Sequence, residues 1–119
     1  MKKIDIEKKA YGTAVTLLEA KGFVSPVDLF MKMGRLSKKD YEDWRFGRVP
    51  YLEKVLQGNL RKLSLVMKTL RKFTGDYDLK PSCTGYNKWG KDPKKRLRFS
   101  ASQHPEIEKA YATHYVKSK

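Results

Sequence analysis

Residues 60–73, Leu-Arg-Lys-Leu-Ser-Leu-Val-Met-Lys-Thr-Leu-Arg-Lys-Phe, carry the clearest structural pattern in the chain. Apolar residues recur there every three or four positions, which is the spacing of one face of an α-helix. This apolar stripe consists of Leu63, Val66, Met67, Leu70 and Phe73. The pattern predicts a long helix that ends near Gly75 and packs the stripe into a core.

Three further helices are predicted upstream. The first covers residues 4–21 and ends before Gly22, because glycine commonly stops a helix. Its apolar stripe is Ile4, Tyr11, Ala14, Val15 and Leu18. The next two begin after Ser25 and Ser37, since serine is a preferred N-cap and an aspartate follows each serine three residues later. Gly34 ends the shorter helix that follows Ser25.

Pro50 is predicted to open another helix, since proline suits the first helical position. Its inward residues would be Leu52, Val55 and Leu56. Gly58 leaves two alternatives open. Either it separates this helix from the one at 60–73, or a single bent helix runs through it, because the apolar positions on both sides stay nearly in phase.

After Pro81 the spacing of the apolar residues changes from a helical to an alternating pattern. Residues 83–89 and 97–101 are predicted as two short strands around a Gly-Lys-Asp-Pro turn, and residues 107–116 as a final helix. We therefore expect one α+β domain over residues 1–119. It is mainly helical, with four to six helices and a C-terminal two-stranded antiparallel hairpin, and a winged-helix-like arrangement is one form that such a fold can take.

The predicted hairpin would have two different faces. If Trp89 lies opposite Leu97, then Asn87 lies opposite Phe99, because antiparallel partners share a face. The packed face would hold Trp89, Leu97 and Phe99. The outer face would hold Tyr86, Lys88, Arg98 and Ser100. This arrangement makes Trp89 a core residue and leaves Tyr86 as the ring free to stack on a ligand.

The chain is strongly basic, with a formal charge of +14 over 119 residues. Residues 1–59 hold 12 basic and 8 acidic side chains, a net charge of +4, whereas residues 60–119 hold 15 and 5, a net charge of +10. This asymmetry predicts an anionic partner, with nucleic acid first and an acidic protein as the alternative. The oligomeric state and the choice between DNA and RNA stay open.

Residues 88–98 concentrate this charge, with six basic side chains and one acid beside the aromatic residues Tyr86, Trp89 and Phe99. Basic groups bind phosphates, and aromatic rings stack on bases. The exposed face of the 60–73 helix is the second basic region. The candidate nucleic-acid contacts are Arg61, Lys68, Arg71, Lys72, Tyr86, Lys88, Lys91, Lys94, Lys95, Arg96 and Arg98. A basic surface that is merely solvated is the alternative interpretation.

No catalytic residue, metal ion or cofactor is expected. Cys83 with His104 or His114 is the nearest approach to a nucleophile and base, but one cysteine and two distant histidines form no recognisable catalytic or zinc motif. A single cysteine fits a reducing cytoplasm. The N-terminus lacks the apolar run of a signal peptide, and no stretch approaches the roughly 18–20 apolar residues of a membrane helix. We therefore expect a cytoplasmic protein without membrane insertion.

Four stretches look like a family signature: residues 40–52, residues 79–82, Tyr86 with residues 89–91, and residues 107–116. Together they resemble a family of small basic bacterial proteins of uncharacterised function. The resemblance implies a stand-alone bacterial domain, and no functional residue is carried over from it. Taken by themselves, Trp44, Arg45, Phe46 and Tyr51 around Gly47 and Pro50 indicate a structural elbow between helices.

Overall fold

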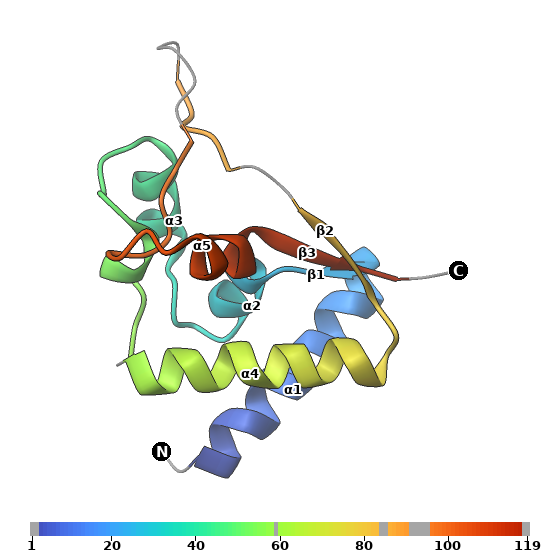
Figure 1. Cartoon of the computed structure of the whole chain (residues 1–119). Helices are drawn as coiled ribbons and strands as arrows, with labels where there is room; N and C mark the ends of the chain where they lie inside the picture. The colour runs from blue at the N-terminus through green and yellow to red at the C-terminus, as the bar shows by residue number, and fades with distance from the viewer. Residues whose placement is uncertain (1–2, 59, 84–85, 91–95, 118–119) are drawn as a thin grey trace.

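The computed structural model of the protein describes residues 3–58, 60–83, 86–90 and 96–117, with the side chains of Lys3, Leu60 and Cys83 excepted. The described residues form a mainly helical α+β fold (Figure 1). The α-helices are α1 (Lys3–Lys21), α2 (Pro26–Lys32), α3 (Lys38–Arg45), α4 (Leu60–Asp76) and α5 (Pro105–Ala112). A 3₁₀-helix η1 spans Leu52–Lys54, and the strands are β1 (Phe23–Val24), β2 (Lys80–Cys83) and β3 (Thr113–Val116). The predicted fold class is confirmed.

The predicted helix starts are confirmed at two serines. The Ser25 hydroxyl accepts a hydrogen bond from the Asp28 N–H at 3.2 Å, and the Ser37 hydroxyl accepts one from the Asp40 N–H at 3.0 Å. The helix predicted from Pro50 is wrong, since only η1 forms there. The amides of Leu52 and Glu53 donate instead to the carbonyl oxygens of Arg98 and Phe99, at 3.2 and 2.9 Å.

Gly58 decides between the two alternatives for the middle of the chain. Its φ is +119°, a conformation that an α-helix does not contain and that glycine adopts without penalty. No bent helix therefore runs through it, and α4 is separate from η1.

The three strands form one antiparallel sheet in the order β1-β3-β2. Phe23 pairs with Val116 on one side of β3, and Lys80 pairs with the same residue on the other side. The expected C-terminal antiparallel pairing is thus present, but between β2 and β3. The helix predicted over 107–116 ends at Ala112, because Thr113, Tyr115 and Val116 have the β-branched and aromatic side chains that favour a strand.

The strands predicted at 83–89 and 97–101 do not form a hairpin ladder. Among the described residues, their pairing is limited to one isolated bridge between Asn87 and Arg96, so the predicted pairing of Asn87 with Phe99 is wrong. The backbone of residues 98–99 pairs with residues 52–53 instead. Tertiary contacts with the middle of the chain have therefore replaced the local hairpin.

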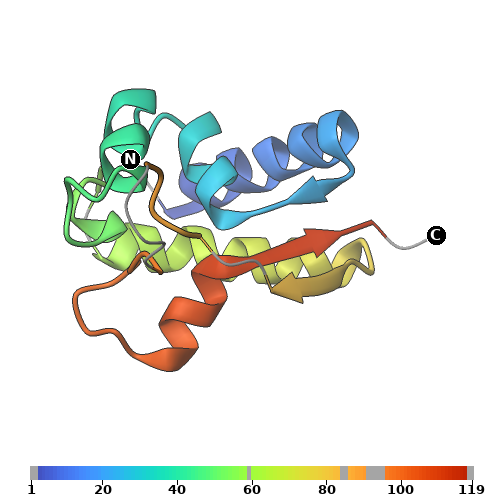
Figure 2. The same ribbon diagram turned by 90° about the horizontal axis from the view of Figure 1, so that it is seen from above.

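The hydrophobic core lies between helices α1 and α4 and the remaining helices and strands, which Figure 1 shows above α4. Helix α1 crosses α4, and the sheet lies beside the C-terminal halves of both helices (Figures 1 and 2). Four members of the α4 stripe are buried as predicted, and Met67 is half-buried. In α1 the buried residues are Ile6, Ala10, Ala14, Leu17 and Leu18, whereas Ile4 is 56% exposed, contrary to the prediction. Within the described residues, no helix has the length and apolar character needed to cross a bilayer.

The connection from β2 to α5 is held at residues 98–100. The Trp44 indole Nε1 donates to the Arg98 carbonyl oxygen at 2.8 Å. The Glu108 carboxylate accepts from the Phe99 amide at 2.9 Å, the Ser100 amide at 2.7 Å and the Ser100 hydroxyl at 2.6 Å. These bonds join α3 and α5 to one short stretch of backbone.

Replacing Glu108 tests this attachment. Glu108→Gln exchanges one charged acceptor oxygen for an amide NH₂ that opposes the donors of Phe99 and Ser100, so we expect a loss of about 1–3 kcal/mol in the free energy of unfolding. Urea denaturation measures it. The control is Glu19→Gln on the exposed side of α1, which should change stability by less than about 0.5 kcal/mol. Equal effects for the two variants would contradict the assignment.

Candidate nucleic-acid interface

The first candidate surface is the α4 basic face, defined as Arg61, Lys68, Arg71 and Lys72. All four side chains are exposed, because the opposite side of the helix is buried in the core. Lys72 forms an ion pair with Asp76 at 3.6 Å. For the other three, no described acid lies within ion-pair distance. The α4 basic face therefore presents three cations that are available to an anion.

Lys72 also belongs to a small network with Tyr11. Its Nζ lies 5.6 Å from the centre of the Tyr11 ring, and the Tyr11 hydroxyl donates to Asp76 at 2.7 Å. This hydrogen bond to a carboxylate raises the pKa of Tyr11 to about 12. Asp76 thus neutralises part of the charge at the C-terminal end of the α4 basic face.

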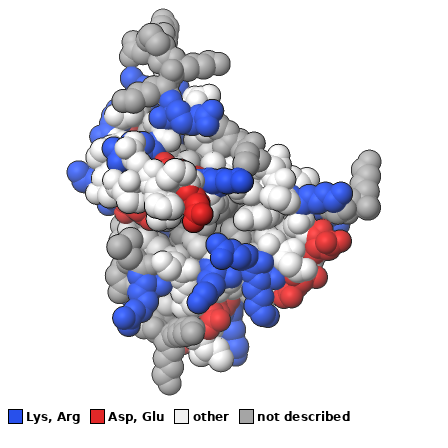
Figure 3. All heavy atoms as spheres, in the orientation of Figure 1, with Lys and Arg blue, Asp and Glu red and all other residues white. Residues whose placement is uncertain are grey.

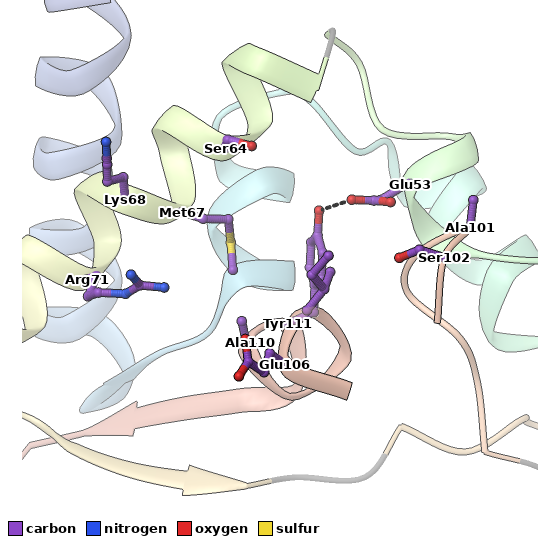
Figure 4. Close-up of a pocket in the computed structure, with 11 residues that line it drawn as sticks. Glu53, Ser64, Met67, Lys68, Arg71, Ala101, Ser102, Glu106, Ala110 and Tyr111 are labelled. Atoms are coloured by element: carbon purple, nitrogen blue, oxygen red, sulfur yellow. Dashed lines mark hydrogen bonds between the residues drawn. The ribbon is translucent and has the colours of Figure 1, made fainter. Parts of the chain in front are cut away.

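A groove of about 570 Å³ lies between α4 and α5 (Figure 4). It is lined by Ser64, Met67, Lys68 and Arg71 of α4, by Glu106, Ile107, Ala110 and Tyr111 of α5, and by Glu53, Ala101 and Ser102. The Tyr111 hydroxyl donates to Glu53 at 2.8 Å, and burial together with this bond raises the pKa of Tyr111. Arg71 extends from α4 toward the groove, so two cations of the α4 basic face form one of its walls.

Tyr86 and Trp89 have exchanged their predicted positions. Tyr86 is buried and packs against Trp44, Phe99 and His114, and its hydroxyl pairs with the His114 Nε2 at 2.9 Å. Burial raises the pKa of Tyr86 to about 12. Trp89 is 37% exposed, because its amide donates to the Arg45 carbonyl oxygen at 2.6 Å at the surface end of α3. The prediction that Tyr86 is the outward ring is wrong.

The other predicted contacts of the 88–98 segment are distributed differently. Arg98 is half-buried and its Nη2 donates to the Ala101 carbonyl oxygen at 2.9 Å, so the expectation of an outward Arg98 is also wrong. Lys88 is half-buried and lies against Gly47. Arg96 is exposed. The predicted contacts Lys91, Lys94 and Lys95 lie outside the described residues.

The second candidate surface is the Trp89 cluster, defined as Tyr41, Arg45, Phe46, Arg48 and Trp89. The Arg45 guanidinium lies 4.7 Å from the centre of the Trp89 ring. Tyr41 and Phe46 meet Trp89 in edge geometry at 5.8 and 5.5 Å. Arg48 lies 5.1 Å from the Phe46 ring and forms an ion pair with Asp43 at 3.0 Å.

The sequence indicates only part of the Trp89 cluster. Arg45, Phe46 and Arg48 stand together in the predicted elbow, which is a signal that could have suggested a cationic aromatic surface. Trp89 joins them only through the fold. Its contact with Arg45 spans more than forty residues of chain, and no local pattern predicts it.

The lysine and arginine side chains form no continuous band of charge on the face of the molecule that Figure 3 shows. In Figure 3 the lysine and arginine side chains form several groups, with uncharged and acidic surface between them. We therefore treat the α4 basic face and the Trp89 cluster as separate surfaces.

Both histidines have structural roles. The His114 ring stacks on Phe23 at 5.2 Å with an interplanar angle of 5°, and His104 caps α5 by accepting from the Glu106 amide at 3.3 Å. The side chain of Cys83 lies outside the described part of the chain. Among the described residues, no group of three or more histidine, cysteine, aspartate or glutamate side chains could hold a metal ion.

Comparison with known proteins finds no matching family model, no matching curated protein and no matching solved structure. The resemblance to a family of small basic bacterial proteins stays a prediction.

The His114 environment predicts a pH-dependent stability. Burial lowers the pKa of His114 below 6.5, and Lys21 adds to this effect, while the nearby Asp28 carboxylate opposes it without reversing it. The folded state therefore binds the His114 proton less readily than the unfolded state does. The unfolding free energy should fall as the pH drops below about 6.5, and this loss should level off below the lowered pKa. Urea denaturation between about pH 7.5 and 5 measures the slope, which His114→Gln should flatten. The control His104→Gln should retain it, and an unchanged slope in His114→Gln would contradict the prediction.

Proposed function

We propose that this protein is a nucleic-acid-binding protein without catalytic activity, and that its affinity comes mainly from contacts to phosphates. The observation that carries the proposal is the α4 basic face, where Arg61, Lys68 and Arg71 are exposed and none has an acid within ion-pair distance among the described residues. Exposed cations of this kind release counterions when they neutralise phosphates, which is the main source of sequence-independent affinity.

The charge of the whole chain supports the same proposal. The net charge of +14 attracts polyanions at long range, and most of it lies in the half of the chain that contains α4 and residues 88–98. The exposed Arg96 would add a phosphate contact. Lys91, Lys94 and Lys95 stay predicted contacts on the sequence alone, since they lie outside the described residues. Lys88 and Arg98 would contribute less than the sequence suggested, since both side chains are half-buried.

The α4–α5 groove favours a second candidate function, the binding of an acidic protein segment. Its apolar lining includes Met67, Ala110 and the 41%-exposed Ile107, and Lys68 and Arg71 stand on one side of it. An amphipathic helix with acidic residues would match both features. A pull-down with and without nuclease separates the two candidate functions. A purified acidic protein that stays bound after nuclease treatment supports this second function, because no nucleic acid is left to bridge the two proteins.

Neutralising the α4 basic face tests the phosphate-binding proposal. The double variant Lys68→Gln/Arg71→Gln should reduce the slope of log Kobs against log[salt] by roughly 1.4–1.8, because each of the two lost phosphate contacts removes about 0.7–0.9 from the slope. Fluorescence anisotropy with labelled 20-nucleotide single strands and duplexes, between about 50 and 200 mM salt, measures it.

The control is Lys8→Gln/Lys9→Gln, which removes the same charge from exposed positions on α1. Its slope should change by less than half as much. Binding that is undetectable at low salt, or equal losses in both double variants, would overturn the proposal.

A further inference from the structure

We propose that Trp89 is a stacking platform for an unpaired base, and that the preferred ligand is therefore single-stranded nucleic acid. This inference rests on the proposed nucleic-acid binding and adds the class of substrate and a second point of contact. It concerns the Trp89 cluster and is independent of the contacts made by α4.

The exposure of Trp89 is the first observation. The chain has two tryptophans, and Trp44 is completely buried, whereas Trp89 is 37% exposed beside Phe46, which is 40% exposed. The two exposed rings lie side by side on the surface, with their centres 5.5 Å apart. Tyr86, the ring expected from sequence to take this role, is buried.

The way the ring is held is the second observation. The Trp89 amide donates to the Arg45 carbonyl oxygen at 2.6 Å, which fixes the backbone at the end of α3. Tyr41 and Phe46 contact the ring with interplanar angles of 87° and 78°, so both neighbours meet it in edge geometry. A ring fixed in this way loses little conformational entropy when a ligand stacks on it.

The charge around the ring is the third observation. Arg45 lies over one face of the indole at 4.7 Å, and Arg48 lies over the Phe46 ring at 5.1 Å. Arg96, which is exposed, pairs with Asn87 two residues before Trp89. Arg45 is half-buried and Arg48 is paired with Asp43, so Arg96 is the cation of this group that is exposed and has no described acid within ion-pair distance. An exposed cation near an exposed aromatic ring matches the alternation of phosphate and base in a nucleic acid strand.

Stacking on such a ring requires a base that is not already stacked in a duplex. Single-strand-binding proteins use aromatic side chains in this way, and each stacked base contributes about 1–3 kcal/mol. Duplexes offer phosphates to the α4 basic face but no free base to Trp89. The inference therefore predicts a preference for single strands that depends on the ring of Trp89.

The test compares one 15-nucleotide single strand with the corresponding duplex, by anisotropy and by tryptophan emission. For the unaltered protein, the single strand should quench tryptophan emission and bind at least fivefold more tightly than the duplex. Trp89→Leu should weaken single-strand binding by roughly 5- to 150-fold, the equivalent of one stacked base, and should abolish the quenching because only buried Trp44 remains. Its duplex affinity should change less than twofold.

Two further variants serve as controls. Trp89→Phe retains an aromatic face and should keep most of the single-strand affinity, which guards against a general folding defect in Trp89→Leu. Tyr77→Leu removes another exposed ring, 45% exposed after the end of α4, and should leave the preference for single strands unchanged.

The outcomes separate the two proposals. Equal affinity for single strand and duplex, unaffected by Trp89→Leu, would overturn the stacking platform, while the salt-dependent effect of the α4 variants would leave nucleic-acid binding in place. The absence of binding to either ligand would overturn both. Loss of duplex and single-strand binding by the same factor in Trp89→Leu, with wild-type thermal stability, would also overturn the stacking role.

Discussion

The backbone of residues 98–100 is the junction on which the tertiary structure depends. The Arg98 carbonyl oxygen accepts hydrogen bonds from the Trp44 indole of α3 and from the Leu52 amide of η1. The Glu108 carboxylate of α5 accepts three hydrogen bonds from Phe99 and Ser100. A buried backbone must have its polar groups satisfied, and here three separate elements supply the partners. α3, η1 and α5 are therefore positioned against one another through this short stretch.

The aromatic core around the junction explains which rings reach the surface. Phe99 lies 5.1 Å from Trp44, 5.4 Å from Tyr86 and 5.4 Å from Tyr111, so the Phe99 ring is enclosed by other aromatic side chains. Tyr86 completes this enclosure and is consequently buried. Three residues later, Trp89 is bonded to the end of α3 and lies outside the enclosure. The same packing that removes Tyr86 from solvent thus leaves Trp89 accessible.

The two candidate surfaces suit two different kinds of contact. The α4 basic face offers exposed point charges on a rigid helix whose other side is buried, which suits phosphates in any sequence or strand form. The Trp89 cluster offers an aromatic ring with an arginine on one face, which suits an unpaired base. The α4–α5 groove, which Lys68 and Arg71 line on one side, places an apolar surface next to these two cations.

The sequence by itself determined helices α1 to α4 and the basic character of the protein. Helix α4 follows from the period of Leu63, Val66, Leu70 and Phe73, and the starts of α2 and α3 follow from local capping by Ser25 and Ser37. These features depend on neighbours within a turn of helix, so their signals are local. The strand pairing and the surface rings depended instead on partners far away in the chain. Residues 97–101 alternate like a strand, but their carbonyl groups bond to η1 and Trp44, and the exposure of Trp89 depends on its bond to Arg45. Only the tertiary structure decided these positions, because the hydrogen-bonding partners of residues 97–101 and of Trp89 come close to them only when the chain folds.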